Sequence, residues 1–509
     1  MCRKFAISAA LGAMLCFPVH VAAAPAPPIS PSHPFTSAQI ASMHSLIDRL
    51  AATTPLRRAR IGVSIVQAST GRVLASREPD GEFAPASNFK LLDAASALAY
   101  LGPRYRFRTQ LFARGAVDQG VLDGDLVFVG GGDPVLTRND LRAAAMAVAA
   151  HGIQTITGSV VVDESFFDRQ RYGSGWAWDD FPYYYQPPVQ ALAVEEGTAD
   201  VTVTPGKSAG EPVAAQIEAS GGAMTVVSHA ITSPAHGLDD ADCFRSPGAT
   251  QIQIIGHVPV DAKPDVYKCA VDDSAAFAVG ALRDLLQLAG VAVGSTPRGA
   301  APDDGPLDIE DRGPLPASAT SRYPDAALVW SHESPTVAAL ITTMMPPSDN
   351  FIAEHLFKAL PTAAFHQRGS FDGGADVERK FIASLGLDPA SIDNGDGSGL
   401  SEGDRITPRD ITTILRWEWQ GPYRDLYVYS LGRPGIDGTV RRHLVGTDSV
   451  GRVWAKDGYI WHVSTFSGYA FTRHHGLVVF SIMMNDADGP LAPSHAAQDV
   501  IVRTLVDLP

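Results

Sequence analysis

Lysine is scarce in this 509-residue chain: of its 40 basic residues only eight are lysine, at positions 4, 90, 207, 263, 268, 358, 380 and 456. Arginine therefore supplies most of the positive charge, and its guanidinium group does not lose a proton in a protein. A buried lysine, by contrast, can lose its proton near neutral pH. Only Lys90 has a serine three residues before it, so a lysine at position 90 is a mild hint of acid–base chemistry.

Long hydrophobic runs and excess positive charge are also missing from the chain that follows the first 24 residues. The first 24 residues resemble a cleavable export signal, with basic Arg3 and Lys4, an apolar stretch and a small-residue end at Ala22–Ala24. No small residue directly precedes Cys16, which argues against a lipid-anchored form. The mature chain is then exported, and we expect it in the periplasm.

Beyond that signal no stretch approaches the roughly 18 apolar residues of a membrane span. The signal carries two basic and no acidic residues, so its removal takes the formal net charge from −15 to −17. Such a charge disfavours nucleic acid and anionic membrane as partners.

Cysteine is equally rare, and two of the four cysteines leave with the signal. The remaining pair, Cys243 and Cys269, lies in one region of an exported protein and predicts a structural disulfide.

Metal-binding patterns are absent from the sequence. The segment 393–404 is rich in Asp and Gly, but glycines 395 and 397 stand where a calcium loop needs ligands, so a turn is predicted. The histidines lack ligand spacing with each other or with carboxylates; those considered are His355, His443, His462, His474 and His475. No metal and no cofactor is predicted.

The stretch Pro85–Lys90 comes directly before the apolar run Leu91–Leu98. The run predicts a buried helix, with Ser87 in its first turn and Lys90 one turn later on the same face. A desolvated lysine next to a serine could act as its base. Ser-x-x-Lys is short enough to arise by chance, so the pattern alone does not decide for catalysis.

The order of elements predicts an α+β fold. Hydrophobic periodicity indicates a helix, two strands, a helical centre, three strands and a final helix, which assemble most simply into one five-stranded antiparallel sheet with helices on both faces. The segments 25–105 and 326–509 form this unit. Residues 106–325 alternate in short β-like segments and predict a β-rich insertion. Within it, the aromatic cluster 172–185 is expected to serve packing.

Three short motifs fit one chemistry when taken in order: Ser87-x-x-Lys90, Ser348-Asp349-Asn350 and Lys456-Asp457-Gly458. They resemble the motifs of the penicillin-recognising serine enzymes. The 261 residues from Ser87 to Ser348 resemble the class C low-molecular-mass penicillin-binding proteins, the D-alanyl-D-alanine carboxypeptidase/endopeptidase family, in which that interval holds two inserted domains. Further matching segments are 124–134, 163–167, 348–354, 396–401 and 435–439.

The resemblance implies a transpeptidase/β-lactamase-like domain and acyl transfer through a serine ester. Neutral Lys90 would take the proton of Ser87, which attacks a D-alanyl peptide bond. The implied partners are peptidoglycan peptides, with β-lactam antibiotics as covalent inhibitors. The remaining roles are an oxyanion site at the N–H groups of Ser87 and Tyr459, proton relay by Ser348, substrate amide binding by Asn350 and positive charge from Lys456.

The third motif departs from the family pattern Lys-Thr-Gly, because Asp457 replaces the threonine whose hydroxyl binds a substrate carboxylate, beside Gly458 and Tyr459. Two carboxylates about 4 Å apart repel by about 1–4 kcal/mol, depending on the dielectric. That corresponds to a loss of roughly 5- to 1000-fold. We therefore expect weak carboxypeptidase activity and weak penicillin acylation, with cross-link endopeptidase activity better preserved.

Two other functions remain open on sequence alone. The altered third motif would also suit a protein of this fold that binds peptidoglycan or a partner without turnover. An esterase or β-lactamase would share the fold and the first motif, although the long insertion argues against it.

Overall fold

The computed structural model describes residues 33–218, 220–295, 313–487 and 491–509. The predicted export signal, residues 1–24, lies outside them. Within the described ranges no helix is both long enough and apolar enough to cross a bilayer.

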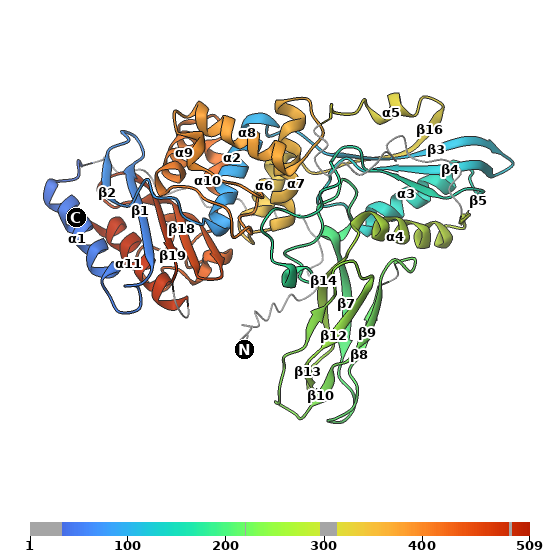
Figure 1. The fold of residues 1–509 in the computed structure, drawn as a ribbon, viewed down its shortest axis with the longest axis horizontal. Helices are drawn as coiled ribbons and strands as arrows, with labels where there is room; N and C mark the ends of the chain where they lie inside the picture. Colours follow the sequence, from blue (N-terminus) through green and yellow to red (C-terminus); the bar gives the residue numbers. More distant parts are fainter. Residues whose placement is uncertain (1–32, 219, 296–312, 488–490) are drawn as a thin grey trace.

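A five-stranded antiparallel sheet forms the core of the catalytic unit, as predicted (Figure 1). The chain contributes to it from both ends, since Ser64 of the first strand pairs with Ser481 of the last. Helices α1 (Ser37–Ala51) and α11 (Ala492–Asp507) cover one face through residues such as Ile47 and Ile501. The strands in sheet order are β17 (Val453–Ile460), β18 (Val463–Phe471), β19 (Leu477–Asn485), β1 (Arg60–Gln67) and β2 (Val73–Arg77).

A helical cluster covers the other face. Its central helix, α2 (Lys90–Tyr100), is buried from Lys90 to Leu98 and contacts the surrounding helices on all sides. A helix that is apolar all round belongs in a core. The other members are α6 (Val337–Met344), α7 (Asn350–Ala364), α8 (Phe371–Ser384), α9 (Pro408–Gln420) and α10 (Arg424–Ser430).

The insertion begins and ends with an α/β unit, which extends away from the catalytic unit (Figure 1). Its sheet consists of β15 (Ala292–Val293), β5 (Thr155–Ile156), β4 (Val121–Val129), β3 (Arg108–Asp118) and β16 (Ala326–Glu333), with β6 (Val160–Asp163) beside β4. Its helices are α3 (Arg138–Ala150), α4 (Ser274–Leu288) and α5 (Ala319–Arg322).

One predicted boundary is wrong. Residues from 326 were assigned to the catalytic unit, but β16 pairs along its length with β3 of the insertion, for example Leu328 with Phe112. The chain returns to the catalytic unit at Ser334, whose N–H donates to the carbonyl of Phe107. Strand pairing decides to which unit an edge strand belongs, and local sequence pattern carries no information on that partner.

A second, β-rich unit is nested inside the first and forms the arm that points downward in Figure 1. A disulfide joins Cys243 and Cys269, two buried residues on different strands whose Cα atoms are 6.1 Å apart. The strands are β7 (Thr198–Thr204), β8 (Ala214–Ile217), β9 (Thr225–Ser228), β10 (Ile231–Ser233), β11 (Asp242–Phe244), β12 (Gln251–Ile255), β13 (His257–Pro259) and β14 (Asp265–Ala270).

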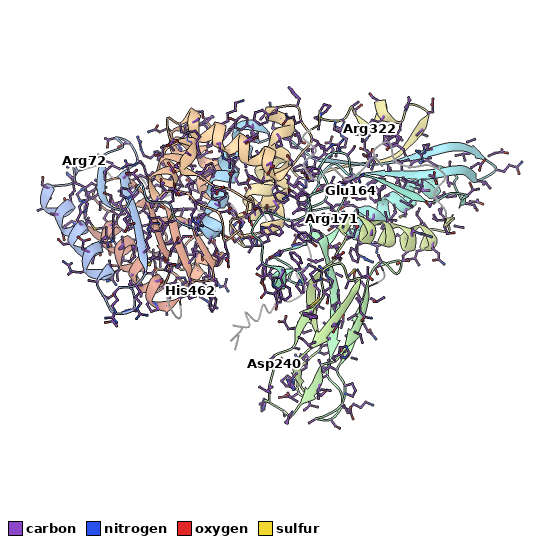
Figure 2. All side chains as sticks on the ribbon, in the orientation of Figure 1. Arg72, Glu164, Arg171, Asp240, Arg322 and His462 are labelled. Atoms are coloured by element: carbon purple, nitrogen blue, oxygen red, sulfur yellow. A yellow bond between two sulfur atoms is a disulfide. The ribbon has the colours of Figure 1, made fainter. Side chains whose placement is uncertain are left out.

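Short 3-10 helices occupy several of the connections. They are η1 (Ala86–Phe89), η2 (Trp178–Asp180), η3 (Glu195–Gly197), η4 (Pro389–Ser391) and η5 (Thr439–Arg442). The insertion meets the catalytic unit along the segment that contains Glu164 and Arg171 (Figure 2). This junction lies beside α7, since His355 of that helix contacts the carbonyl of Gln190 at 3.1 Å.

Candidate active site

Ser87 lies in the 3-10 turn η1, directly before α2. The expected α-helical first turn is therefore wrong in detail, because α2 begins only at Lys90. The turn is anchored to the sheet: the side chain of Asn88 donates to Thr465 Oγ1, and Thr465 Oγ1 donates to the carbonyl of Pro85 at 2.8 Å. Ser87 stays partly exposed while its neighbours are buried.

The side-chain amine of Lys90 lies 3.1 Å from Ser87 Oγ. It also donates to Asn350 Oδ1 at 2.7 Å and to the carbonyl of Ser398 at 2.9 Å. Burial lowers the pKa of Lys90 to about 7, and the positive charge of Lys456 acts in the same direction. Lys90 is accordingly uncharged in a large fraction of molecules at neutral pH and can accept a proton from Ser87.

The second motif forms the start of α7. Asp349 is the N-cap and accepts a hydrogen bond from the N–H of Ile352 at 2.9 Å, so Asn350 is the first residue of the helix. The side chain of Asn350 bonds Lys90 through Oδ1 and donates through Nδ2 to the carbonyl of Tyr185, 2.9 Å away, in the insertion. Ser348 has a φ of +65°, a conformation uncommon outside glycine and often found at functional sites.

The third motif lies inside strand β17, which continues past the motif to Ile460. Gly458 faces Ser87 closely: a Cβ atom added to this glycine would lie 2.7 Å from the N–H nitrogen of Ser87 and 2.4 Å from Thr465 Oγ1. Only glycine lets the strand approach the nucleophile at this distance. The next residue, Tyr459, is 53% exposed.

Asp457 lies on the opposite face of β17 from Gly458, since successive side chains of a strand alternate. Its carboxylate accepts a hydrogen bond from the hydroxyl of Thr439 and lies 3.4 Å from the amine of Lys456. Burial acts to raise the pKa of Asp457, but the Lys456 charge and the Thr439 hydroxyl outweigh it and hold that pKa below its usual value. Asp457 is therefore an anion whose carboxylate contacts Thr439 and Lys456.

Lys456 is buried, and its amine donates to the carbonyl of Asp457 at 2.7 Å. Burial lowers the pKa of Lys456, although the charge of Asp457 and its hydrogen bond oppose this change. The positive charge of Lys456 is thus partly offset by the carboxylate of the adjacent Asp457.

Residues 43–305 and 316–505 match the family model described as the D-Ala-D-Ala carboxypeptidase 3 (S13) family. The chain belongs to this family. It is 32% identical over 486 residues to a D-alanyl-D-alanine carboxypeptidase of Actinomadura sp. (strain R39), covering 93% of this chain and 86% of that protein.

Solved structures share the fold. Penicillin binding protein 4 (dacB) from Haemophilus influenzae aligns over 91% of this chain and 99% of its own, with a TM-score of 0.77 and 22% identity. The same protein complexed with a β-lactam aligns over the same shares, with a TM-score of 0.71 and 21% identity. The matched ranges include the insertion, so the insertion is part of the S13 architecture in this chain.

One part of the candidate site was not predicted as functional. The loop 396–401, expected to be a turn, supplies the Ser398 carbonyl that Lys90 contacts. The Asp-Gly-Ser sequence of this loop, which resembles the family, was the signal that could have identified it as part of the site. The aromatic cluster 172–185 packs on itself as expected, with Tyr172 stacked on Phe181 and Tyr183 on Tyr185. Tyr185 reaches the candidate site only through its backbone carbonyl, which accepts from Asn350.

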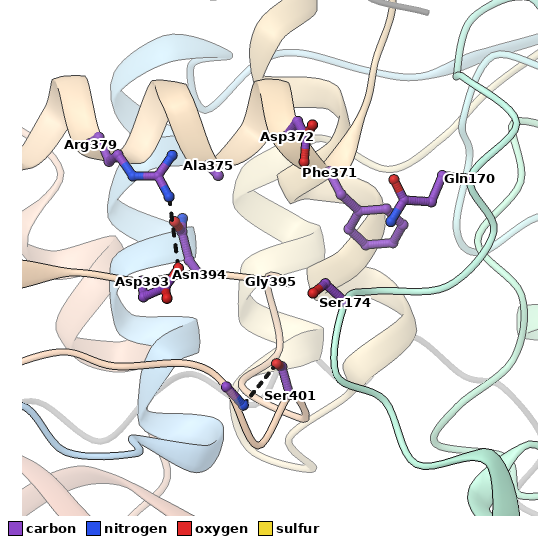
Figure 3. A pocket seen from close by; sticks show the side chains of 11 residues that line it. Gln170, Ser174, Phe371, Asp372, Ala375, Arg379, Asp393, Asn394, Gly395 and Ser401 are labelled. Atoms are coloured by element: carbon purple, nitrogen blue, oxygen red, sulfur yellow. Dashed lines mark hydrogen bonds and ion pairs between the residues drawn. The ribbon is translucent and has the colours of Figure 1, made fainter. Parts of the chain in front are cut away.

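A cavity of about 290 Å³ lies next to the loop 396–401 but contains none of the predicted site residues (Figure 3). It is bordered by α8, by the insertion at Gln170 and Ser174, and by Gly395, Ser401 and Gly403. Among the described residues no group of histidine, cysteine and carboxylate side chains could hold a metal ion.

Proposed function

We propose that this chain is a serine D-alanyl-D-alanine carboxypeptidase and endopeptidase, which hydrolyses peptidoglycan stem peptides and cross-links through an acyl-enzyme on Ser87. The observation that carries the proposal is the 3.1 Å contact between Ser87 Oγ and a buried Lys90 amine whose pKa is about 7. The similarity to the carboxypeptidase of Actinomadura sp. (strain R39) supports the substrate class.

In the first half-reaction, neutral Lys90 takes the hydroxyl proton as Ser87 Oγ bonds to the carbonyl carbon of the D-alanyl residue. The N–H groups of Ser87 and Tyr459 stabilise the oxyanion. Ser348 then relays this proton from Lys90 to the leaving amine, the C–N bond breaks, the acyl group remains on Ser87 as an ester, and Lys90 is neutral again. In the second half-reaction Lys90 takes a proton from the water that attacks this ester, the bond between Ser87 Oγ and the acyl carbon breaks, and Lys90 returns the proton to Ser87 Oγ.

A β-lactam would enter the same first half-reaction, because its strained amide also presents a carbonyl carbon to Ser87. The opened ring keeps the leaving amine attached, so the ester on Ser87 persists. We therefore propose β-lactams as covalent inhibitors. An exported, periplasmic location follows from the predicted signal and places the enzyme where peptidoglycan is.

Digestion of purified muropeptides tests the function. We expect the mature chain to release D-alanine from pentapeptide monomers and to convert cross-linked dimers into monomers, as measured by liquid chromatography with mass detection. Pretreatment with penicillin G should stop both reactions, because it consumes Ser87. Unchanged muropeptides would mean a protein that binds without turnover. Rapid nitrocefin turnover without muropeptide cleavage would identify a β-lactamase.

Replacing Asp457 by threonine should raise carboxypeptidase activity relative to endopeptidase activity by about fivefold, which is the low end of the charge-repulsion range. The low end applies because the Asp457 carboxylate is already engaged by the hydroxyl of Thr439 and the amine of Lys456, which offset part of its charge. The readout is kcat/KM for a pentapeptide with a free terminal carboxylate against the value for a cross-linked dimer.

Asp457→Asn is the matched control, since it removes the charge but keeps the shape. If charge is the cause, both variants shift the ratio in the same direction. Equal ratios in the wild type and in both variants would refute the argument from charge.

A further inference from the structure

The amine of Lys90 has three partners in the structure: Ser87 Oγ, Asn350 Oδ1 and the carbonyl of Ser398. The amide oxygen and the peptide carbonyl can only accept hydrogen bonds. A neutral amine has two N–H bonds and one lone pair. Both N–H bonds are therefore used by these two acceptors, which leaves the lone pair for the hydroxyl of Ser87.

The direction of that lone pair depends on where the Ser398 carbonyl lies. Ser398 belongs to residues 396–401, which we name the acceptor loop. The loop is held by carboxylates: Glu354 of α7 accepts from the N–H groups of Gly397 and Ser398, each at 3.0 Å and each with a different oxygen. Within the loop, Asp396 accepts from two further N–H groups, of Gly399 and Ser401, at 2.7 Å.

The insertion reaches the same loop. The indole N–H of Trp176 donates to Asp396 Oδ2 at 2.7 Å. Nine residues further on, Tyr185 accepts from Asn350. One segment of the insertion thus contacts Asn350, which accepts from Lys90, and Asp396, two residues before Ser398 in the acceptor loop. Ser401 of the acceptor loop also lines the cavity of Figure 3.

We propose that Glu354 and Trp176 are positioning residues for the reaction at Ser87: they fix the acceptor loop so that Lys90 presents its lone pair to the nucleophile. The inference rests on the proposed function, since it concerns the same proton transfer. It gives the insertion a part in the chemistry, through Trp176, in addition to its own fold.

Charged groups face Lys90 from β17, from α7 with its N-cap and from the acceptor loop. Lys456 of β17 acts to lower its pKa, and the carboxylates of Glu354, Asp396 and Asp349 act to raise it. Asp93, one turn further along α2, also interacts with Lys90. Burial and the charge of Asp396 raise the pKa of Glu354 to about 8, so Glu354 and Lys90 titrate over the same pH range. Ionised Glu354 favours the ammonium form of Lys90, and Glu354→Gln removes that effect and should lower the pKa of Lys90. Acylation requires the neutral amine, so the pH at half-maximal rate should move down.

The experiment measures the rate constant of acylation by a fluorescent penicillin from pH 5 to pH 9 in the full mature chain. In the wild type the rate should rise through about pH 7. Glu354→Gln cannot accept from both N–H groups, so its plateau rate should fall about tenfold, and its midpoint should move to lower pH. Trp176→Phe removes the indole N–H that holds Asp396, so its plateau rate should fall about fivefold. The substitution changes no charge, so the midpoint of its pH profile should not move.

Trp178→Phe is the matched control, because Trp178 is exposed two residues away and should retain the wild-type profile. If Glu354→Gln lowers only the fraction of protein that is labelled, with wild-type rate and midpoint, the role is structural and the proposal fails. A Trp176→Phe rate equal to that of Trp178→Phe also overturns it. If the wild type itself is not acylated, the proposed function fails instead.

Discussion

Alanine at position 87 should abolish covalent labelling by penicillin and all release of D-alanine, at every pH and penicillin concentration. Ser87 Oγ is the hydroxyl that Lys90 contacts, and Gly458 leaves the space against its N–H group. Without Oγ no ester can form, and the N–H groups that remain can only bind the carbonyl oxygen. The measurement is intact-protein mass after incubation with penicillin G, where the wild type should gain the mass of one penicillin.

The matched control is Ser96→Ala. Ser96 lies on α2, is fully buried, and its hydroxyl has no hydrogen-bond partner among the described residues. This variant should be acylated at the wild-type rate, which separates loss of the nucleophile from loss of a hydroxyl near it. A penicillin adduct on the Ser87→Ala protein would show that another residue, such as Ser348, is the nucleophile.

Lys90→Arg should reduce the acylation rate by about 10²- to 10⁴-fold, the usual contribution of a general base. Arginine keeps the positive charge and can donate hydrogen bonds, but it does not deprotonate in a protein. Lys90 does so because burial brings its pKa to about 7. The pH profile should change too, since the variant has no group at position 90 that gains activity through pH 7.

Lys380→Arg is the control for this substitution, because Lys380 is an exposed residue of α8 that lies over the rings of Tyr100 and Phe365. It should keep the wild-type rate. Thermal unfolding of both variants separates a chemical defect from a folding defect. A Lys90→Arg protein with native unfolding behaviour and at least a tenth of the wild-type rate would show that Lys90 is not the base.

Much of the catalytic unit was predictable because its signals are local. The short apolar runs of strands β1, β18 and β19, bounded by turn residues, and the apolar run of α2 follow directly from residue order. The first motif could be found because Ser87 and Lys90 are separated by one turn, so their contact needs no long-range information. The second and third motifs gained weight only from their order along the chain.

The features that failed to follow from sequence depend on distant partners. Strand β16 joined the insertion because its partner is β3, more than 200 residues earlier. The orientation of Asp457 depends on Thr439, which its sequence neighbours do not indicate. The acceptor loop looked like an ordinary turn until Glu354 and Trp176 were placed beside it.

The sequence by itself determined the chemical groups of the site: a serine three residues before a buried lysine, two further motifs, and an insertion between them. The tertiary structure decided how those groups act. It bonded the Asp457 carboxylate to Thr439, and it placed acceptors for both N–H groups of Lys90, so that the lone pair remains for the nucleophile. The reason is physical: residue type sets which hydrogen bonds and charges are possible, but only packing brings distant donors and acceptors within 3 Å of each other.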